Sequence, residues 1–303
     1  MEIFTENFKN LKSSFIVDEI NKNGYFAFEE ALTGEFLNLI EEEATENKTN
    51  LNNNLTTGVF LKKQYYFVNL LTKSQEFFRY LTSDVLYDIY KDYFGNNFRL
   101  KAMRYYETYS GHIMPWHSDN KTEQEILDTK GLIFIFYVSD VFDGEFQYIS
   151  GSHNWSLAKG VNEFSDEYIN QNYSEDIKSF KLPKGSIIIY NTYGLHRAKP
   201  IKNKNYVRKS IFTQIDNNLS NGEPIIVNTS LINVEKNWVK EFLGFGLRQT
   251  YQAFPKTNMN TLPINVQLSI LLKIISNLPK NLILSFYLTK LVYRKISRFV
   301  SKS

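Results

Sequence analysis

The chain contains one group of residues whose types and spacing suit a transition-metal ion. His117 and Asp119 are separated only by Ser118, and His196 follows much later; the whole chain has four histidines. Residues at positions i and i+2 of a strand point to the same side, so this imidazole and carboxylate can reach one ion. Two histidines and one carboxylate form the facial triad that holds Fe(II) and leaves the opposite face open for O2 and a co-substrate. We therefore interpret His117, Asp119 and His196 as metal ligands at a catalytic iron centre.

Short β-rich runs surround these residues between about residues 98 and 215. The runs end at Gly, Asp, Asn or Pro and comprise Leu100–Tyr109, Gly131–Val138, Ser186–Tyr190 and Val207–Ile215. Helical patterns precede them, one capped by Thr33 and another extending from about Ser74 to Tyr93. This order predicts an α+β fold whose sheet closes into a double-stranded β-helix, the cupin-like jelly roll, with N-terminal helices flanking it. The mouth of such a barrel suits a metal site.

Composition excludes several classes of function. The chain has 303 residues, a net charge of +3 and no cysteine. The charge is too small to indicate a nucleic-acid partner, and without cysteine there are no disulfides, zinc fingers or iron–sulfur clusters. The N-terminus lacks the pattern of a signal peptide, and no run of eighteen apolar residues occurs. We expect a cytoplasmic protein, and the pattern specifies no oligomeric state.

The last forty residues form a basic amphipathic segment. Ile264–Leu278 and Leu282–Phe299 both have helical patterns, separated by a break at Pro279. The segment has no Asp or Glu, and its basic residues are Lys273, Lys280, Lys290, Arg294, Lys295, Arg298 and Lys302. A basic helical pair of this kind can lie on an anionic membrane surface or dock on a partner. Packing on the barrel is the favoured alternative, because amphipathic helices are mostly core elements, and peripheral membrane contact through residues 264–303 is left open.

Four stretches together resemble the phytanoyl-CoA dioxygenase family of Fe(II)/2-oxoglutarate-dependent oxygenases. Trp116-His117-Ser118-Asp119 is similar to the WHxD metal motif of that family. The other three are Asn23-Gly24-Tyr25 before a helix, Ser150-Gly151-Ser152-His153 with serine in place of the usual proline, and Gly194-Leu195-His196-Arg197 followed by Arg208. The segment after about residue 220 has no counterpart in the resemblance.

The resemblance implies three cofactors and co-substrates: Fe(II), 2-oxoglutarate and O2. Arg208 stands where the family has the arginine that pairs with the distal carboxylate of 2-oxoglutarate, and its planar fork suits that partner. Ser210 shares the strand face of Arg208 and can donate its hydroxyl to the same carboxylate, whereas Lys209 points to the other face. Tyr106 and Thr108 lie on the strand that leads to the triad and either line the pocket or pack in the barrel.

The implied reaction is hydroxylation of an aliphatic carbon in a small-molecule, lipid-type or sugar-type substrate, with release of succinate and CO2. Desaturation, ring closure and epimerisation remain alternatives, and Asp119 argues against a halogenase, which leaves that ligand position empty for chloride. We assign the oxygenase domain to residues 1–220, with a helical N-terminal region over residues 1–97 and a jelly roll over residues 98–220. Residues 221–263 form a connecting extension, and residues 264–303 form the basic helical segment.

Three other classes of function are compatible with the sequence. A cupin-like module could hold a metal at the same histidines without turnover, and such a site would not need Arg208. A hydrolase could use zinc at the triad, although the WHxD context fits iron better. A membrane-surface protein could act mainly through residues 264–303.

Overall fold

The chain divides into two units, Met1–Lys256 and Thr257–Ser303, in the computed structural model. The structure describes residues 1–50, 58–61, 63–67, 69–119, 129–155, 164–219, 225–232, 234, 236–247, 264–265, 267–273 and 275–276. The first unit contains the candidate site, and the second contains the basic segment.

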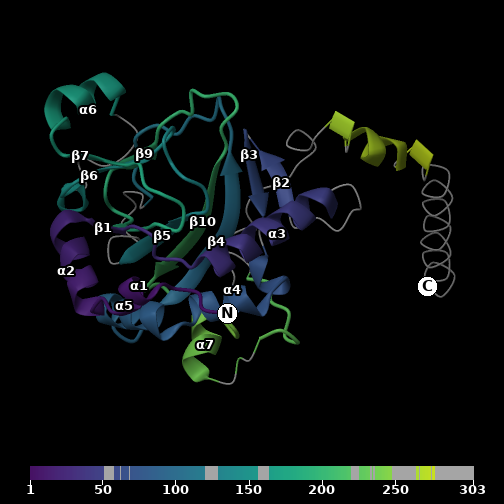
Figure 1. The fold of residues 1–303 in the computed structure, drawn as a ribbon, viewed down its shortest axis with the longest axis horizontal. Helices are drawn as coiled ribbons and strands as arrows, with labels where there is room; N and C mark the ends of the chain where they lie inside the picture. The colour runs from purple at the N-terminus through teal and green to yellow at the C-terminus, as the bar shows by residue number, and fades with distance from the viewer. Residues whose placement is uncertain are drawn as a thin grey trace, which may run out of the picture. The chain divides into compact units, whose positions relative to one another are not determined.

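Seven antiparallel strands form the major sheet of the first unit, in the order β1-β8-β5-β10-β4-β3-β2 (Figure 1). Their bounds are β1 Tyr25–Phe28, β2 Gly58–Leu61, β3 Gln64–Phe67, β4 Arg99–Thr108, β5 Gly131–Tyr137, β8 Ile187–Asn191 and β10 Arg208–Asp216. Every residue of β5 is buried, and its sequence is apolar throughout rather than alternating. This pattern is expected of a strand that is covered on both faces.

A minor sheet covers one face of the major sheet. It has the order β7-β6-β9, with β6 at Phe146–Ile149, β7 at Ile177–Phe180 and β9 at His196–Ala198. Alternate residues of β5 and β8, such as Ile135 and Ile188, pack against β6 and β7 in one apolar cluster. The two facing antiparallel sheets form the jelly roll that the sequence predicts, so the predicted fold class is confirmed.

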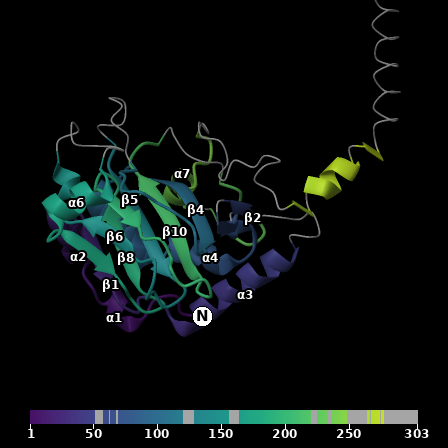
Figure 2. The same cartoon turned by 90° about the horizontal axis from the view of Figure 1, so that it is seen from above.

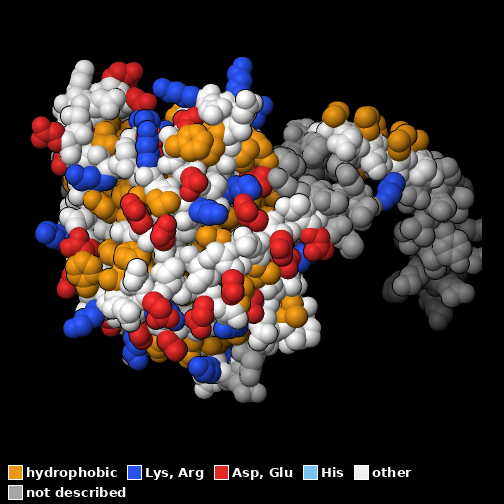
Figure 3. Space-filling view, in the orientation of Figure 1, with side chains coloured by type: hydrophobic (Ala, Val, Ile, Leu, Met, Phe, Trp, Pro, Cys, Tyr) orange, Lys and Arg blue, Asp and Glu red, His pale blue; other side chains and the backbone are white. Residues whose placement is uncertain are grey.

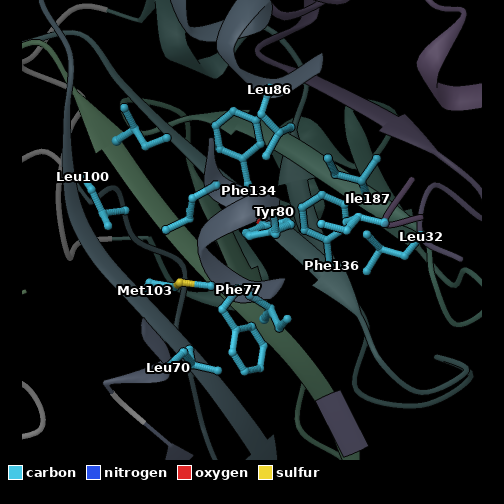
Figure 4. Close-up of a cluster of buried hydrophobic side chains, with 14 of the residues drawn as sticks. Leu32, Leu70, Phe77, Tyr80, Leu86, Leu100, Met103, Phe134, Phe136 and Ile187 are labelled. Atoms are coloured by element: carbon cyan, nitrogen blue, oxygen red, sulfur yellow. The ribbon is translucent and has the colours of Figure 1, made fainter. Parts of the chain in front are cut away.

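Helices cover the opposite face of the major sheet (Figure 2). They are α1 Glu6–Lys9, α2 Ser13–Asn23, α3 Gly34–Asn50, α4 Gln75–Leu81 and α5 Asp84–Phe94. The described part of the unit also contains α6 Asp166–Tyr173, α7 Asn237–Phe242 and two 3-10 turns, Leu70–Thr72 and Ser152–Asn154. Figure 4 shows how Phe77, Tyr80 and Leu86 from the helices meet Phe134 and Phe136 of β5. This core packs against one face of the major sheet, and the cavity described below lies on the other face, towards the minor sheet.

Two helices replace the single helix that the pattern predicts from Ser74 to Tyr93. The hydroxyl of Ser83 accepts a hydrogen bond from the backbone N–H of Leu86, which caps the start of α5. The hydroxyl of Thr82 donates to the carbonyl of Phe78 at the end of α4. These local bonds compete with the helical ladder and break it, although the apolar stripe continues across the break.

The region predicted to be helical, residues 1–97, also supplies three strands to the major sheet. The alternating bulk of the residues after Gly24 predicts a brief strand, and β1 lies there and pairs with β8. The sequence does not predict β2 and β3, which form an antiparallel hairpin and join the sheet through β4. Their sequences, Gly58–Leu61 and Gln64–Phe67, show no alternation of apolar and polar residues.

The second unit is described over one helical stretch. Residues 264–265, 267–273 and 275–276 are helical, as the pattern of Ile264–Leu278 predicts, whereas Leu282–Phe299 lies outside the described residues. No helix within the described ranges is long and apolar enough to cross a membrane.

Candidate metal centre

Backbone pairing brings the two predicted histidine ligands together. His117 follows β4 and forms an isolated antiparallel bridge with His196, the first residue of β9. The two residues exchange both backbone hydrogen bonds, at 3.0 and 2.9 Å, and their ring centroids lie 4.4 Å apart. The segment around His117 thereby continues the minor sheet beside β9. Residues 79 positions apart are thus neighbours.

Asp119 completes a group of three potential ligand atoms. Its Oδ1 lies 3.8 Å from Nε2 of His117, and its Oδ2 lies 3.3 Å from Nε2 of His196. One ligand atom from each residue lies within 4.8 Å of the others. Ligands at right angles around a metal with bonds of about 2.1 Å lie about 3 Å apart. The two separations from Asp119 are close to this spacing, so the nitrogen and oxygen donors suit one divalent ion.

Backbone carbonyls orient both imidazoles. Nδ1 of His117 donates to the carbonyl of Pro115 at 2.8 Å, and Nδ1 of His196 donates to the carbonyl of Gly194 at 3.0 Å. A carbonyl oxygen can only accept, so these bonds place the proton on Nδ1 and leave the lone pair on Nε2. Both Nε2 atoms face Asp119, which is the orientation that a metal needs.

The electrostatics of the triad favour the protonation states that bind a metal. Burial lowers the pKa of His117, and the neighbouring His196 lowers it further. Burial alone would raise the pKa of Asp119, but His196, His117 and a hydrogen bond from Tyr190 hold it below its usual value. A neutral imidazole and an ionised carboxylate are the ligand forms. The shifted pKa values of His117 and Asp119 therefore favour the metal-binding protonation states before a cation binds.

Tyr190 of β8 is a fourth polar group at the triad. Its hydroxyl donates to Oδ2 of Asp119 at 3.3 Å and lies 3.4 Å from Nε2 of His196. Burial, together with the charge of Asp119, raises the pKa of this phenol well above its ordinary value. A neutral phenol is a hydrogen-bond donor, so Tyr190 holds the carboxylate in place. Sequence reasoning missed Tyr190, although it is the one polar-tipped side chain in the apolar run Ile187–Tyr190.

A cavity between the two sheets opens at the triad. It has a volume of about 470 Å³, including its open mouth. Aromatic and aliphatic side chains form most of its wall, and the lining residues are Tyr106, Met114, His117, Asp119, Ile135, Tyr137, Phe146, Tyr190, His196, Ala198, Arg208, Ser210 and Phe212. All five predicted site residues therefore line one cavity.

Arg208 and Ser210 lie on the inner face of β10 and are buried, with exposed fractions of 4% and 1%. The Arg208 guanidinium donates to the carbonyl of Gly144 and, at 3.4 Å, to the hydroxyl of Thr108. Within the described residues, the Ser210 hydroxyl has no hydrogen-bond partner. A buried hydroxyl without a partner costs free energy, and a ligand in the cavity can remove that cost. The pair is therefore suited to an anionic ligand.

The strand register explains the roles of Tyr106 and Thr108. Arg208 is paired with Thr108, and Ser210 with Tyr106. Thr108 also accepts a hydrogen bond of 3.0 Å from the buried amide of Gln64 on β3. Tyr106 lines the cavity, whereas the hydroxyl of Thr108 accepts a hydrogen bond from the Arg208 guanidinium. The hairpin that sequence reasoning missed thus contributes to the position of the arginine.

Two other residues singled out in the sequence lie away from the cavity. Lys209 points to the other face of β10, as the alternation predicts, and forms an ion pair of 2.9 Å with Glu41 of α3. Nε2 of His153 lies 3.0 Å from the carbonyl of Asn21, at the end of α2. The family-like loop Ser150–His153 therefore holds α2 against the barrel, and His153 has a packing role.

Comparison by sequence finds no relatives: no protein-family model matches the chain, and no curated protein matches it. Comparison by sequence therefore does not confirm the resemblance to the phytanoyl-CoA dioxygenase family.

Comparison by structure does find similar proteins. One is SnoK, a non-haem 2-oxoglutarate-dependent carbocyclase from nogalamycin biosynthesis (TM-score 0.52, 14% identity, 69% of this chain and 85% of SnoK). Another is HygX from Streptomyces hygroscopicus, solved with nickel, 2-oxoglutarate and hygromycin B bound (TM-score 0.54, 12% identity, 76% and 99%). A third is the epimerase SnoN, also from nogalamycin biosynthesis (TM-score 0.54, 12% identity, 81% and 95%). The chain therefore has the jelly-roll fold of these enzymes.

Proposed function

We propose that the protein is an Fe(II)- and 2-oxoglutarate-dependent oxygenase related to the phytanoyl-CoA dioxygenase family. One observation carries the proposal: the triad shares its cavity with a buried arginine and with a serine hydroxyl that has no partner among the described residues. A module that only holds a metal does not need this second polar group. The structural likeness to 2-oxoglutarate-dependent enzymes supports the same assignment by analogy of fold.

His117, Asp119 and His196 would hold Fe(II), which supplies the chemistry of O2 activation when bound. The protein contributes the geometry. The carbonyls of Pro115 and Gly194 keep each Nε2 directed at the ion, and Tyr190 keeps the Asp119 carboxylate from rotating away. Three protein ligands on one face leave room for a bidentate co-substrate on the other.

Arg208 and Ser210 would bind the distal carboxylate of 2-oxoglutarate. The guanidinium and the hydroxyl of these residues can both donate to its oxygens, while Thr108 and the Gly144 carbonyl hold the guanidinium. The co-substrate would then occupy the cavity that Arg208 and Ser210 share with the triad. Burial of Arg208 and Ser210 strengthens these charge-assisted bonds because water is excluded.

The reaction we propose is hydroxylation of an aliphatic carbon. In this stoichiometry 2-oxoglutarate, O2 and the substrate give succinate, CO2 and the hydroxylated product. The side chains of Met114, Ile135, Phe146 and Phe212 give the cavity an apolar wall, which suits the carbon skeleton of a small-molecule, lipid-type or sugar-type substrate. Structures of HygX with hygromycin B and of SnoN with nogalamycin RO support small molecules as the substrate class by analogy.

An anaerobic calorimetric titration tests the two binding roles separately. The wild type should bind one equivalent of Fe(II) and then 2-oxoglutarate, and His117→Ala or Asp119→Ala should bind neither at the site. Arg208→Ala should keep the iron but bind 2-oxoglutarate about a hundredfold more weakly, the cost of two charge-assisted bonds. Lys209→Ala, on the other face of β10, is the control and should match the wild type. Retained 2-oxoglutarate affinity in Arg208→Ala would contradict the assignment.

A further inference from the structure

The helix of the second unit exposes a continuous apolar face. Its large apolar side chains recur at positions i, i+4, i+7, i+8 and i+11 and are 48–69% exposed: Ile264, Leu268, Leu271, Leu272 and Ile275. At 3.6 residues per turn this spacing places all five on one side. In Figure 3, hydrophobic side chains line one side of this helix. Isolated exposed leucines are common, but a full stripe of them indicates a binding surface.

Polar side chains share a separate sector of the same helix, beside the apolar face: Asn265, Ser269, Lys273 and Ser276. Gln267 borders the apolar face on its other flank. The apolar sector is wide and the polar sector narrow. A helix with a wide apolar face and a narrow polar sector that carries a lysine and no acidic residue is typical of segments that lie in the plane of a membrane interface.

The charge of the surrounding sequence is strongly asymmetric. From Phe242 to Ser303 the chain has nine Lys and Arg residues and no Asp or Glu, whereas residues 1–241 have 26 basic and 32 acidic residues. The tail therefore carries a net charge of +9, and the rest of the chain carries −6. The net charge of +3 for the whole chain is the sum of these two opposite charges. An anionic surface would attract the tail and repel the remainder.

We propose that residues 264–276 form a peripheral docking surface for anionic lipid bilayers. The apolar face would enter the boundary between headgroups and acyl chains, and the basic residues of the tail would lie at the headgroups. Each basic side chain near an anionic surface contributes about fivefold to binding. A second copy of the tail fits less well, because two segments of charge +9 repel each other. The proposal does not depend on the oxygenase activity.

Co-sedimentation of the full chain with lipid vesicles tests the proposal. We expect binding to vesicles of phosphatidylcholine containing about a quarter phosphatidylglycerol, and at least tenfold weaker binding to pure phosphatidylcholine. Raising the salt from about 0.05 M to 0.5 M should weaken binding to the anionic vesicles at least tenfold, because the Debye length shortens. Absence of binding at low salt, or equal binding to both vesicles, would overturn the proposal.

A matched pair of variants tests whether the apolar face makes the contact. Leu268→Glu and Ser269→Glu change the charge equally at adjacent positions, the first within the apolar face and the second within the polar sector. Leu268→Glu should reduce vesicle binding at least tenfold, and Ser269→Glu less than threefold, because only the first places a carboxylate against the acyl chains. Equal losses would show that charge alone acts and would overturn the apolar contact. A self-association that Leu268→Glu abolishes, without vesicle binding by the wild type, would assign the face to a second copy of the chain.

Discussion

The phenolic oxygen of Tyr190 lies 3.3 Å from Oδ2 of Asp119 and 3.4 Å from Nε2 of His196. β8 thus adds a neutral donor to a triad whose three members come from other segments. The hydroxyl has no other hydrogen-bond partner among the described residues. Its position indicates that the carboxylate is held in the orientation needed for a metal, rather than left to rotate.

Tyr190→Phe should therefore weaken metal binding. Loss of a group that orients a metal ligand typically costs about 10–100-fold in metal affinity or activity. Titration with Co(II), followed by its visible spectrum, measures the affinity directly. Tyr148→Phe is the control: it removes a comparable bond, from the Tyr148 hydroxyl to the carbonyl of Asn191, and keeps the ring that stacks with His196. Equal Co(II) affinities in both variants and the wild type would contradict the positioning role.

Ser210→Ala should weaken the binding of 2-oxoglutarate without lowering the free energy of unfolding. The Ser210 hydroxyl is buried and has no partner in the described structure, so its removal should leave the free energy of unfolding unchanged or slightly higher. The KM for 2-oxoglutarate should rise about tenfold, the cost of one charge-assisted bond. Steady-state succinate release and urea denaturation give the two quantities. An unchanged KM would remove Ser210 from the co-substrate site.

His153 should make folding pH-dependent. Burial lowers the pKa of His153 from 6.5, and its hydrogen bond with Asn21 only partly opposes this. The unfolded chain then binds the proton more readily than the folded chain, so the free energy of unfolding falls as the pH drops below about 6.5. Between pH 7 and the lowered folded pKa, His153→Gln should show a smaller change in urea midpoint. Both proteins are compared without metal, because His117 acts in the same direction. Parallel pH profiles would contradict this prediction.

Gly24→Ala should be strongly destabilising. Gly24 ends α2 with a φ of +87°, and a Cβ there would lie under 3.0 Å from Tyr148 Oη and from His153 Nδ1. We expect a loss of at least about 2 kcal/mol, from the left-handed backbone and the overlap together. Gly34→Ala is the control, because nothing lies within 4 Å of its Cβ. Thermal unfolding of both variants measures the difference, and similar stabilities would contradict the argument.

Local patterns in the sequence predicted the site residues and the main strands that position them. The i, i+2 spacing places His117 and Asp119 together without knowledge of the fold, and alternation along β10 places Arg208 opposite to Lys209. The long β-rich runs predicted β4, β5, β8 and β10 because each has enough residues for its pattern to be recognised. The jelly roll follows from their order.

Contacts between distant segments could not be predicted in the same way. The bond from Gln64 to Thr108 depends on the pairing of a four-residue strand, and Tyr190 reaches Asp119 because the backbone N–H of Asp119 donates to the carbonyl of Thr192, just after β8. The carbonyls that orient the histidines depend on the backbone conformation of Pro115 and Gly194. Sequence patterns record periodicity, whereas these contacts depend on register and loop conformation.

Succinate release from 2-oxoglutarate in air, after anaerobic loading with Fe(II), measures whether the triad and Arg208 form an oxygenase site. Turnover of the co-substrate can be measured before the substrate is identified. We expect succinate formation by the wild type and by Lys209→Ala, and its loss in His117→Ala, Asp119→Ala and Arg208→Ala. Succinate formation that persists without the triad, or an iron-loaded wild type that forms none with candidate substrates present, would contradict the oxygenase assignment.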